Sequence, residues 1–452
     1  MKKILLTLTI FLASFSAHAQ EIQLTQEEKI YGLSLIWQEV NYNYAYLQNY
    51  NLDWDSLYRA NIPKVLAAKN LLEYYSVLSK TINSFHEGHT TIILPSDIKK
   101  LYGNVPIAMS YINGNYYVTA FSSKYKDKVS LGSMLVSVND YNVNDYFKKF
   151  LFPDNNLATH IAKRQMGKGR FFAGLLSEEL NATFLNPNGK TVSLKLKRMP
   201  YFPKEIKIIE VPRMYQDTAF LYKKYGDIAY IRINSFLNNT PSTSFSKLVD
   251  SLKHKKAIIF DIRSNKGGNS QYATDIVSYF SNKETMPIWW GQHKVNKGYS
   301  KAVGVHTFLY GDSLAKANNY YADFVNLSYF EGGQYSYPNN TNGELKDLRV
   351  VVLCNYATIS SAEAFILQLK QVTSVTVIGE PTAGSSTMPL EVRLPGGGGF
   401  KIATVKALDE NGQQYKYTEP DITLIPSLED EIEGNDIVLL RAIDFLNNFK
   451  KD

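Results

Sequence analysis

Two short stretches of the chain contain side chains that could perform chemistry together. HEGHT, at residues 86–90, holds His89, and TISSAE, at residues 358–363, holds Ser360. Histidine accepts a proton near neutral pH, and a serine hydroxyl attacks a carbonyl carbon once a base takes its proton. The pair could therefore supply the base and the nucleophile of an acyl-transfer reaction.

A metal site is the alternative interpretation of HEGHT. Zinc peptidases of the H-E-x-x-H kind place two histidines four residues apart on one face of a helix. Here His86 and His89 are three residues apart, and Gly88, predicted to end the preceding helix, lies between them. We therefore expect no metal and no organic cofactor. His89 is predicted to be a general base, with a purely structural histidine as the alternative, and His86 to be a helix residue.

Ser360 also has a structural interpretation. Ser360 and Glu363 fit the S-x-x-E pattern of a capping box, which begins many helices without any catalytic role. The functional interpretation is that Ser360 lies at the N-terminus of a helix that follows a buried strand. Free N–H groups at such a terminus stabilise developing negative charge.

A glycine pair follows another buried strand. In KAIIFDIRSNKGGNS the strand ends near Asp261 and Arg263, and a turn then carries Gly267 and Gly268. Open α/β sheets bind ligands at the carboxyl ends of their strands, and glycines let backbone N–H groups approach a ligand closely. An ordinary glycine turn is the alternative. The stretch lacks the Lys-Ser/Thr pair of a phosphate-binding loop.

The elements that must position these residues fall into three parts. Residues 20–100 are predicted to be helical, and residues 101–203 to be a β module with a helix near 155–178. From 204 to 452, short apolar strands alternate with helices, which is typical of an α/β domain with a largely parallel sheet. Within this part, the stretch 284–345 is predicted to be irregular.

The first residues indicate an exported protein. Residues 1–19 combine two lysines, an apolar stretch and an A-x-A site, a pattern typical of a bacterial signal peptide cleaved after Ala19. We expect a secreted location, periplasmic or extracellular. The net charge of +7 comes from dispersed basic residues, which disfavours nucleic-acid binding. The single cysteine, Cys354, allows no internal disulfide, and no later segment is apolar enough to span a membrane.

Four motifs together resemble the C-terminal-processing (tail-specific) serine peptidase family. They are DIRSNKGG, TISSAE, VIGEPTAG and TEPDI, and they occur in the order that the family has. The resemblance implies an α/β fold with a crotonase-like (ClpP-like) peptidase core at 204–452. It also implies an N-terminal helical bundle at 20–100, a PDZ-like domain at 101–203, and protein or peptide substrates as partners.

The resemblance implies roles for single residues as well. Ser360 matches the family nucleophile, and the N–H of Ser361, with that of Gly267 or Gly268, would form the oxyanion hole. The best-known branch of the family uses a lysine base in a motif like EPTxGKG. This chain has Ser385 where that lysine would be.

A second branch, similar to the core of tricorn protease, takes its base from a histidine in the N-terminal helical part. His89 matches that position, and Glu419 in TEPDI matches the acid of the family, whereas Asp421 is expected to be structural. The interpretation is therefore an exported serine endopeptidase. Because a serine without a base is a poor nucleophile, a non-catalytic peptide- or lipid-binding protein on the same scaffold is the alternative.

Overall fold

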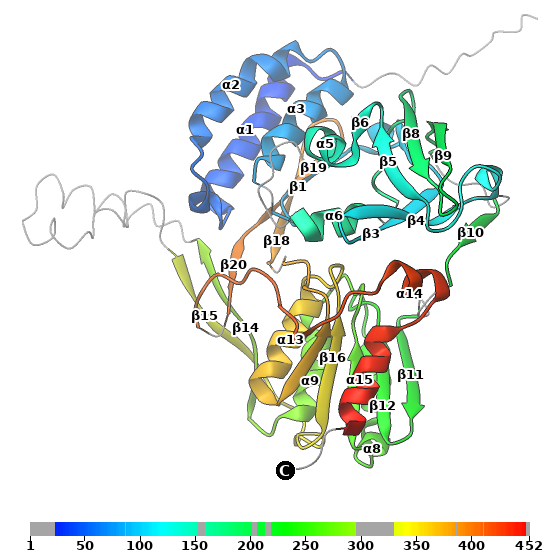
Figure 1. The fold of residues 1–452 in the computed structure, drawn as a ribbon. Coiled ribbons are helices and arrows are strands. Elements are labelled where there is room, and N and C mark those ends of the chain that lie inside the picture. Colours follow the sequence, from blue (N-terminus) through cyan, green and yellow to red (C-terminus); the bar gives the residue numbers. More distant parts are fainter. Residues whose placement is uncertain are drawn as a thin grey trace, which may run out of the picture.

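The computed structural model describes residues 23–85, 87–151, 159–167, 169–200, 206–212, 218–294, 330–384, 387–409 and 411–448. The predicted signal peptide at residues 1–19 lies outside these residues. The described chain forms a helical part and a β module, which lie side by side, and an α/β core below both of them (Figure 1).

Three helices form the helical part. They are α1 (Gln26–Asn43), α2 (Trp54–Ala67) and α3 (Leu71–Asn83), with the short 3₁₀ helix η1 (Leu47–Asn49) after α1. The helix α1 begins at a capping box in which Thr25 and Glu28 exchange hydrogen bonds of 2.8 and 3.1 Å. The prediction that the last helix ends at Gly88 is wrong, because α3 ends at Asn83. The Ser84 hydroxyl donates to a terminal carbonyl, that of Thr81, at 2.7 Å, so the helix ends without a glycine.

A three-stranded sheet from distant parts of the chain completes the helical part. The strand β1 (Thr91–Ile93) pairs with β19 (Gly399–Ala403), which pairs in turn with β18 (Pro389–Arg393), and both pairs are antiparallel. Phe400 and Ile402 of β19 are fully buried in the same hydrophobic core as the three helices. The core of the helical part is therefore closed by a segment that comes near the end of the sequence.

The β module is built around a seven-stranded antiparallel sheet. Its strands are β3 (Ile107–Ile112), β4 (Asn115–Ser122), β5 (Met134–Val138), β6 (Tyr141–Asn142), β8 (Glu179–Leu185), β9 (Thr191–Lys197) and β10 (Ile208–Glu210). The hairpin predicted at Asn113-Gly114 is present, with positive φ at both residues. The strands β8 and β9 form a second hairpin around Gly189.

The helices of the β module are shorter than predicted. Among the described residues the predicted helix 155–178 corresponds to α6 (Thr159–Gly167), and its predicted start at 155–158 lies outside them. Gly169 has a φ of +78°, and the described residues after it are not helical. The next residues form β7 (Gly174–Leu175), which pairs with β2 (Tyr102–Gly103). The remaining short helices are α4 (Ser96–Lys99), η2 (Ser123–Tyr125), α5 (Val143–Tyr146) and the π-helix η3 (Phe147–Leu151).

The α/β core has a six-stranded sheet. In spatial order its strands are β11 (Phe220–Tyr225), β12 (Ile228–Ile233), β13 (Ala257–Asp261), β16 (Arg349–Cys354), β17 (Val375–Gly379) and β21 (Ile422–Thr423). All neighbours are parallel except β11, which pairs antiparallel with β12. The predicted, largely parallel sheet is confirmed.

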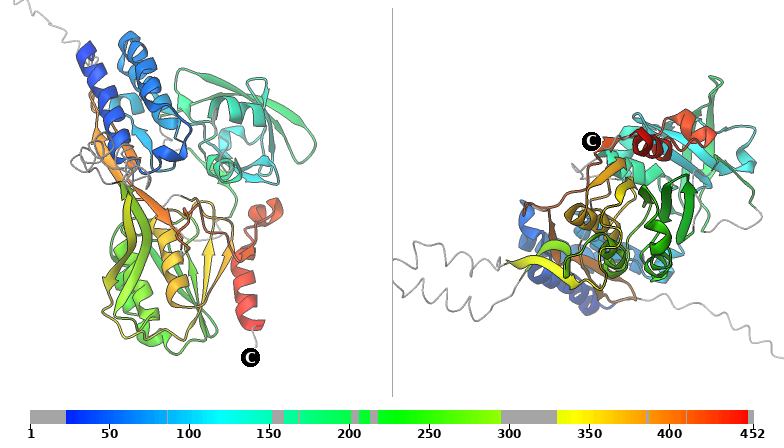
Figure 2. Two further views of the ribbon diagram at one scale, coloured as in Figure 1. Left: turned by 90° about the vertical axis from the view of Figure 1, so that its left-hand side faces the viewer. Right: turned by 90° about the horizontal axis from the view of Figure 1, so that it is seen from below.

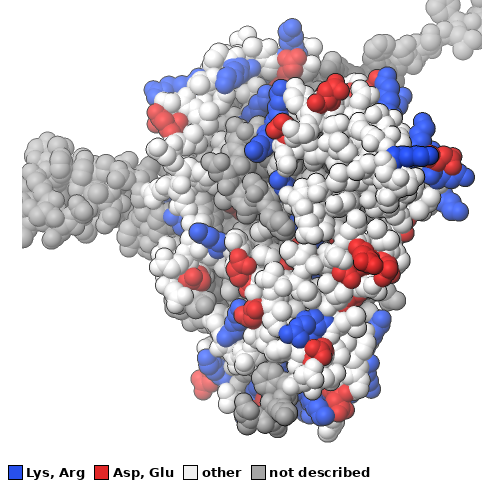
Figure 3. Space-filling view, in the orientation of Figure 1, with Lys and Arg blue, Asp and Glu red and all other residues white. Residues whose placement is uncertain are grey.

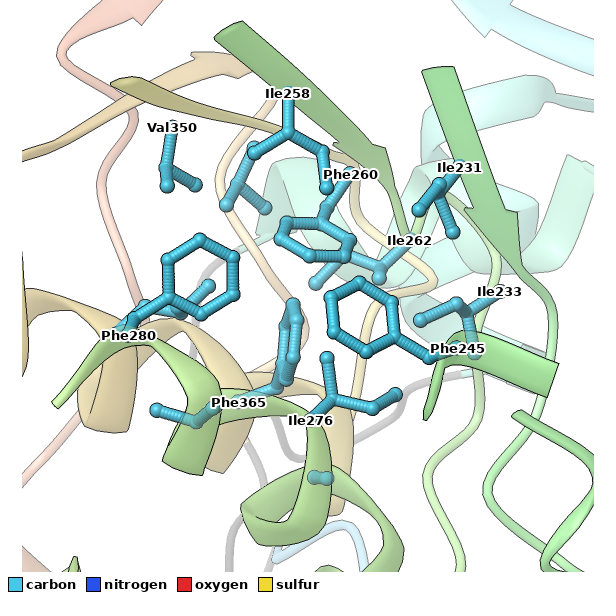
Figure 4. Packing of buried hydrophobic residues seen from close by; sticks show 14 of the residues in the cluster. Ile231, Ile233, Phe245, Ile258, Phe260, Ile262, Ile276, Phe280, Val350 and Phe365 are labelled. Carbon is cyan, nitrogen blue, oxygen red and sulfur yellow. The ribbon is translucent and has the colours of Figure 1, made fainter. Parts of the chain in front are cut away.

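Helices cover both faces of this sheet (Figure 2). On one face lie α7 (Thr240–Ser246), α8 (Val249–Leu252), α9 (Ser270–Val277), η4 (Ser278–Phe280) and α13 (Ser361–Val372), and on the other lies α15 (Ile437–Asn448), which follows α14 (Leu428–Glu433). Figure 4 shows Phe260 of β13 against Phe365 of α13, edge to face with ring centroids 5.1 Å apart. Burial on both faces explains why these strands are almost uninterrupted apolar runs.

The prediction that residues 284–345 are irregular is wrong for their described part. The strands β14 (Thr285–Lys294) and β15 (Phe330–Pro338) form a long antiparallel hairpin, and β20 (Val405–Leu408) pairs with β14. Gly291 pairs with Gly333, and a side chain at Gly332 would strike the carbonyl oxygen of Gly291. Glycines at such positions remove the apolar alternation by which strands are predicted.

One buried ion pair joins the β module to the core. Arg164 of α6 pairs with Glu380, directly after β17, at 2.5 Å and donates to the carbonyl oxygen of Tyr111 at 2.6 Å. The guanidinium also lies 4.6 Å from the ring centre of Tyr356. Because Tyr356 belongs to the loop that leads to Ser360, the β module is held against that loop.

Neither the charge distribution on the face drawn in Figure 3 nor the Cys354 thiol indicates a further chemical role. Basic and acidic side chains are interspersed on the face drawn in Figure 3. Within the described chain, no helix has the length and apolar character to cross a bilayer. Cys354 is fully buried at the end of β16, and burial raises the pKa of its thiol, so it is a poor nucleophile.

Candidate active site

Three loops meet at the carboxyl ends of β12, β13 and β16, and one buried amide ties them together. The Asn265 side chain donates to the carbonyl oxygen of Ile233 at 3.0 Å and accepts from the N–H of Gly267 at 2.8 Å. Its backbone carbonyl accepts from the N–H of Ile359 at 3.0 Å. Asn265 therefore positions both the glycine pair and the loop before Ser360. Sequence reasoning missed this role, although the residue lies inside the motif DIRSNKGG.

Ser360 has a strained backbone. It directly precedes α13 with φ +61° and ψ −125°, whereas an ordinary helix N-cap lies in the β region. Such a conformation costs about 1–3 kcal/mol in a residue with a side chain and is concentrated at functional sites. The Ser360 side chain is half-buried. Glu363 accepts from the Ser360 N–H at 3.1 Å, so the predicted capping box is present, but the backbone of Ser360 is not that of an ordinary N-cap.

The glycine pair packs directly against Ser360. Gly267 has φ +78°, and a Cβ there would lie 2.8 Å from the Ser361 nitrogen and 2.9 Å from the Ser360 Cβ. Gly268 has φ +141°, and a Cβ there would lie 2.3 Å from the carbonyl oxygen of Phe236. Both positions require glycine, because the backbone conformation and the lack of space each exclude a side chain.

Two backbone N–H groups next to Ser360 have no acceptor among the described residues, those of Ser361 and Gly268. The carbonyl of Gly267 accepts from the Phe236 N–H at 2.9 Å. Since N–H and C=O point in opposite directions across a trans peptide, the Gly268 N–H points away from Phe236. The N–H of Gly267 is already bound to Asn265, so of the two predicted glycine donors only Gly268 is available.

Glu363 holds a neighbouring loop against Ser360. Its fully buried carboxylate accepts from the Ser360 N–H, from the Thr382 hydroxyl at 2.5 Å, from the Gly384 N–H at 2.8 Å and from the Tyr415 hydroxyl at 3.1 Å. Burial raises the pKa of Glu363. The segment that contains Gly384 is thereby fixed beside the head of α13. Ser385, the residue in place of the family lysine, lies outside the described residues.

His89 follows the helical part and lies next to a carboxylate. Its Nδ1 is 3.6 Å from Oε1 of Glu87, and its backbone N–H donates to both oxygens of that carboxylate at 3.0 and 3.1 Å. The Thr90 hydroxyl donates to Glu87 at 2.7 Å. Burial acts to raise the pKa of Glu87, but the hydrogen bonds and charge of His89 outweigh it and hold this pKa below its ordinary value. Glu87 was missed from the sequence, although HEGHT contains it; His86 is outside the described residues.

The other sequence-predicted carboxylates lie at the surface. Glu419 is exposed, and its contact with Tyr417 raises the pKa of that hydroxyl after the larger effect of burial. Asp421 accepts from the N–H of Val377 in β17 at 2.7 Å, as expected for a structural residue. Within the described chain no group of three His, Cys, Asp or Glu residues is arranged to hold a metal ion.

A buried charge cluster lies at the end of β13, before the glycine loop. Asp261 is fully buried and accepts from the Tyr230 hydroxyl at 2.7 Å. Arg232 and Arg263 pair with Asp261 at 2.8 and 2.7 Å. Arg263 also donates twice to Asp436, at 2.7 Å each. The cluster joins β12 and β13 to the start of α15. The buried side chains of Asp261 and Arg263 therefore stabilise the base of the glycine loop.

Residues 227–424 match the sequence profile described as "Peptidase family S41". This segment is therefore similar to peptidase family S41, and we refer to residues 227–424 as the S41 domain because of that match. The S41 domain contains Ser360, the glycine pair and Glu363, whereas His89 precedes it.

Curated relatives match the S41 domain and its surroundings. The "Probable CtpA-like serine protease" of Staphylococcus haemolyticus is 24% identical over 236 residues, which are 52% of this chain and 40% of the relative. The "Carboxyl-terminal-processing protease" of Picosynechococcus is 26% identical over 241 residues, 51% of this chain and 47% of the relative. The chain thus spans less than half the length of these relatives. The matches support a serine-type peptidase.

A solved structure extends the likeness beyond the S41 domain. "Crystal Structure of mature CPAF" superposes with a TM-score of 0.68 at 15% identity and covers 94% of this chain and 99% of that one. At this identity the likeness concerns the fold alone. The helical part, the β module and the mixed α/β core are therefore a known arrangement.

Proposed function

We propose that this chain is an exported serine endopeptidase that hydrolyses peptide bonds through an acyl-enzyme on Ser360. The observation that carries the proposal is the strained backbone of Ser360 beside the N–H groups of Ser361 and Gly268, which have no acceptor among the described residues. A serine that only capped a helix would have no need of this strained backbone.

The proposed reaction follows the usual steps of a serine peptidase. The Ser360 hydroxyl attacks the scissile carbonyl while His89 takes its proton. The oxyanion that forms accepts hydrogen bonds from the N–H groups of Ser361 and Gly268. His89 then gives the proton to the leaving amine. A water molecule that His89 deprotonates hydrolyses the acyl-enzyme and restores Ser360.

A chain of contacts supports His89 as the base, as in the histidine-using branch of the family. His89 lies just before β1, which pairs with β19. The neighbouring strand β18 begins a few residues after Gly384, whose N–H is bound to Glu363 beside Ser360. The strands β1, β19 and β18 thus link the segment after His89 to the segment that Glu363 holds beside Ser360, which supports the proposed pairing.

The β module is proposed to be PDZ-like and to present substrates. Its antiparallel sheet and inserted helix α6 support this assignment, and PDZ domains bind extended peptides by strand addition and capture C-terminal carboxylates. The ion pair between Arg164 and Glu380 holds the module beside the loop before Ser360. The substrates are therefore proposed to be proteins or peptides that enter by their tails.

Labelling with a fluorophosphonate probe tests the nucleophile. We expect covalent labelling of the wild-type protein, none in Ser360→Ala, and a reduction of at least about 100-fold in the labelling rate in His89→Ala, because the hydroxyl then lacks its base. Ser270→Ala is the matched control, since this serine lies near Ser361 but outside the proposed chemistry. An unlabelled wild-type protein would instead favour a non-catalytic peptide- or lipid-binding protein.

A pair of variants tests which carboxylate orients His89. Glu87→Gln is expected to lower kcat for peptide hydrolysis at least about tenfold, because a histidine base loses efficiency when its orienting acid is neutralised. The family position Glu419 stays a prediction and is tested in parallel by Glu419→Gln. Full kcat in Glu87→Gln, combined with a loss in Glu419→Gln, would assign the role to Glu419 alone.

A further inference from the structure

The strand β18 has an unpaired edge. In its sheet the order is β1, β19, β18, so β18 pairs with β19 on one side, and no described strand pairs with it on the other. The Thr404 N–H donates to the Met388 carbonyl at 3.1 Å, and the Leu394 N–H donates to the Gly398 carbonyl at 2.9 Å. These two bonds fix which backbone groups of β18 face β19.

Alternation along the strand then identifies the groups at the outer edge. In an antiparallel ladder every second residue bonds the partner strand, so Leu390 and Val392 bond β19, in phase with Met388 and Leu394. The N–H and C=O groups of Glu391 and Arg393 therefore face outward and have no partner among the described residues. The side chains of both residues are also exposed. This edge is a template on which another extended chain can pair.

The strand β18 begins a few residues after a segment that lies beside Ser360. The N–H of Ala383 donates to the Thr358 carbonyl at 2.9 Å and that of Gly384 to Glu363, so this segment runs alongside the loop that carries Ser360. From Gly384 the chain reaches the start of β18 at Pro389 in five residues, which span at most about 17 Å. An extended peptide of about ten residues could pair with β18 and still reach Ser360.

The residues around the edge favour a peptide held by its main chain. Met388 immediately precedes the strand and is 64% exposed, and a methionine side chain adapts to many partners. Pro389, at the first position, has no N–H and limits pairing to the part of the strand that follows. The exposed pair of Glu391 and Lys401, 3.2 Å apart, discourages unspecific pairing between copies of the chain.

We propose that the outer edge of β18 binds an extended segment of the substrate by strand addition and so aligns the scissile bond with Ser360. The proposal rests on the proposed peptidase function and adds a subsite to it. Recognition through backbone groups tolerates many substrate sequences but requires an extended, unfolded segment. Folded proteins would be substrates only through their tails and loose ends.

Proline substitution on the edge tests the proposal. Glu391→Pro removes an outward N–H without removing a bond to β19, and proline is tolerated at such edge positions. We expect the ratio of kcat/KM for a fluorogenic decapeptide to that for p-nitrophenyl acetate to fall at least tenfold, since the small ester does not reach β18. An unchanged ratio would overturn the inference. Lys224→Pro, at an exposed position on the edge strand β11 of the α/β core, is the matched control.

Backbone-methylated substrates give a second test that needs no variant. On the wild-type protein, N-methylation of single amides along the decapeptide is expected to lower kcat/KM at every second residue of the paired stretch, and a uniform response would contradict strand addition. The outcomes separate the two proposals. Failure to hydrolyse the ester or to react with the fluorophosphonate overturns the peptidase itself, whereas normal labelling without these effects overturns only the role of β18.

Discussion

Gly267→Ala is expected to lower kcat/KM for peptide hydrolysis by about 10²–10³-fold. A Cβ at this position would lie 2.8 Å from both the Ile359 carbonyl oxygen and the Ser361 nitrogen. Relieving that contact separates the glycine loop from the segment 359–361, which withdraws the Gly268 N–H from Ser360, and the loss of one oxyanion donor reduces turnover by this factor. Steady-state kinetics with a peptide substrate measures the effect.

Gly226→Ala separates this effect from backbone strain. Gly226 also has a positive φ, +59°, but a Cβ there would have no atom within 4 Å. It lies in the turn between β11 and β12, away from the loops that meet at Ser360. This control is expected to lower the free energy of unfolding by about 1 kcal/mol and to retain its kcat/KM. Full kcat/KM in Gly267→Ala would show that the Gly268 N–H does not contribute to the proposed oxyanion hole.

Asp261→Asn is expected to lower the free energy of unfolding of the core by about 3–5 kcal/mol. The substitution leaves the guanidinium of Arg232, which is fully buried, without its 2.8 Å carboxylate partner and leaves Arg263 only Asp436. Removing one member of a buried charge pair has this effect because the remaining charge stays out of water. Urea denaturation measures the loss, and the exposed Asp250→Asn is the control, expected to leave the urea midpoint nearly unchanged.

The same carboxylate predicts how stability depends on pH. Burial acts to raise the pKa of Asp261, but the charges of Arg263 and Arg232 and its hydrogen bonds lower the pKa from 3.8 to about 2. A lowered pKa adds stability that is present above pH 4 and is lost as the pH falls from about 4 to about 2, in total roughly 2 kcal/mol. The difference in stability between the wild type and Asp261→Asn should therefore narrow over that interval. A constant difference would show that Asp261 does not titrate there.

The parallel core could be predicted because its sequence signals are local. The strands β12, β13 and β16 are continuous apolar runs since both faces of their sheet are covered, and each run ends in a loop with its own motif. Once the strands were known to be parallel, the meeting of Gly267 with Ser360 followed from topology. The prediction that Ser361 and the glycine pair act together with Ser360 rested in addition on the resemblance to the C-terminal-processing peptidase family.

Features that depend on distant contacts could not be read from the sequence. The pairing of β1 with β19 joins segments with no shared pattern, and the glycines of β14 and β15 conceal a regular hairpin. The strain at Ser360 is equally hidden, because S-x-x-E also describes an ordinary cap. The choice between Gly267 and Gly268 depended on the side chain of Asn265, which occupies one of the two N–H groups.

The placement of β19 in the helical core has a consequence for biosynthesis. The helices α1 to α3 leave the ribosome long before Phe400 and Ile402 are translated, so until then a growing chain lacks the strand that completes their core. His89 lies two residues before β1, the strand that pairs with β19. The proposed base therefore reaches its final place only in a nearly finished polypeptide, and we expect prematurely terminated products to lack the proposed activity.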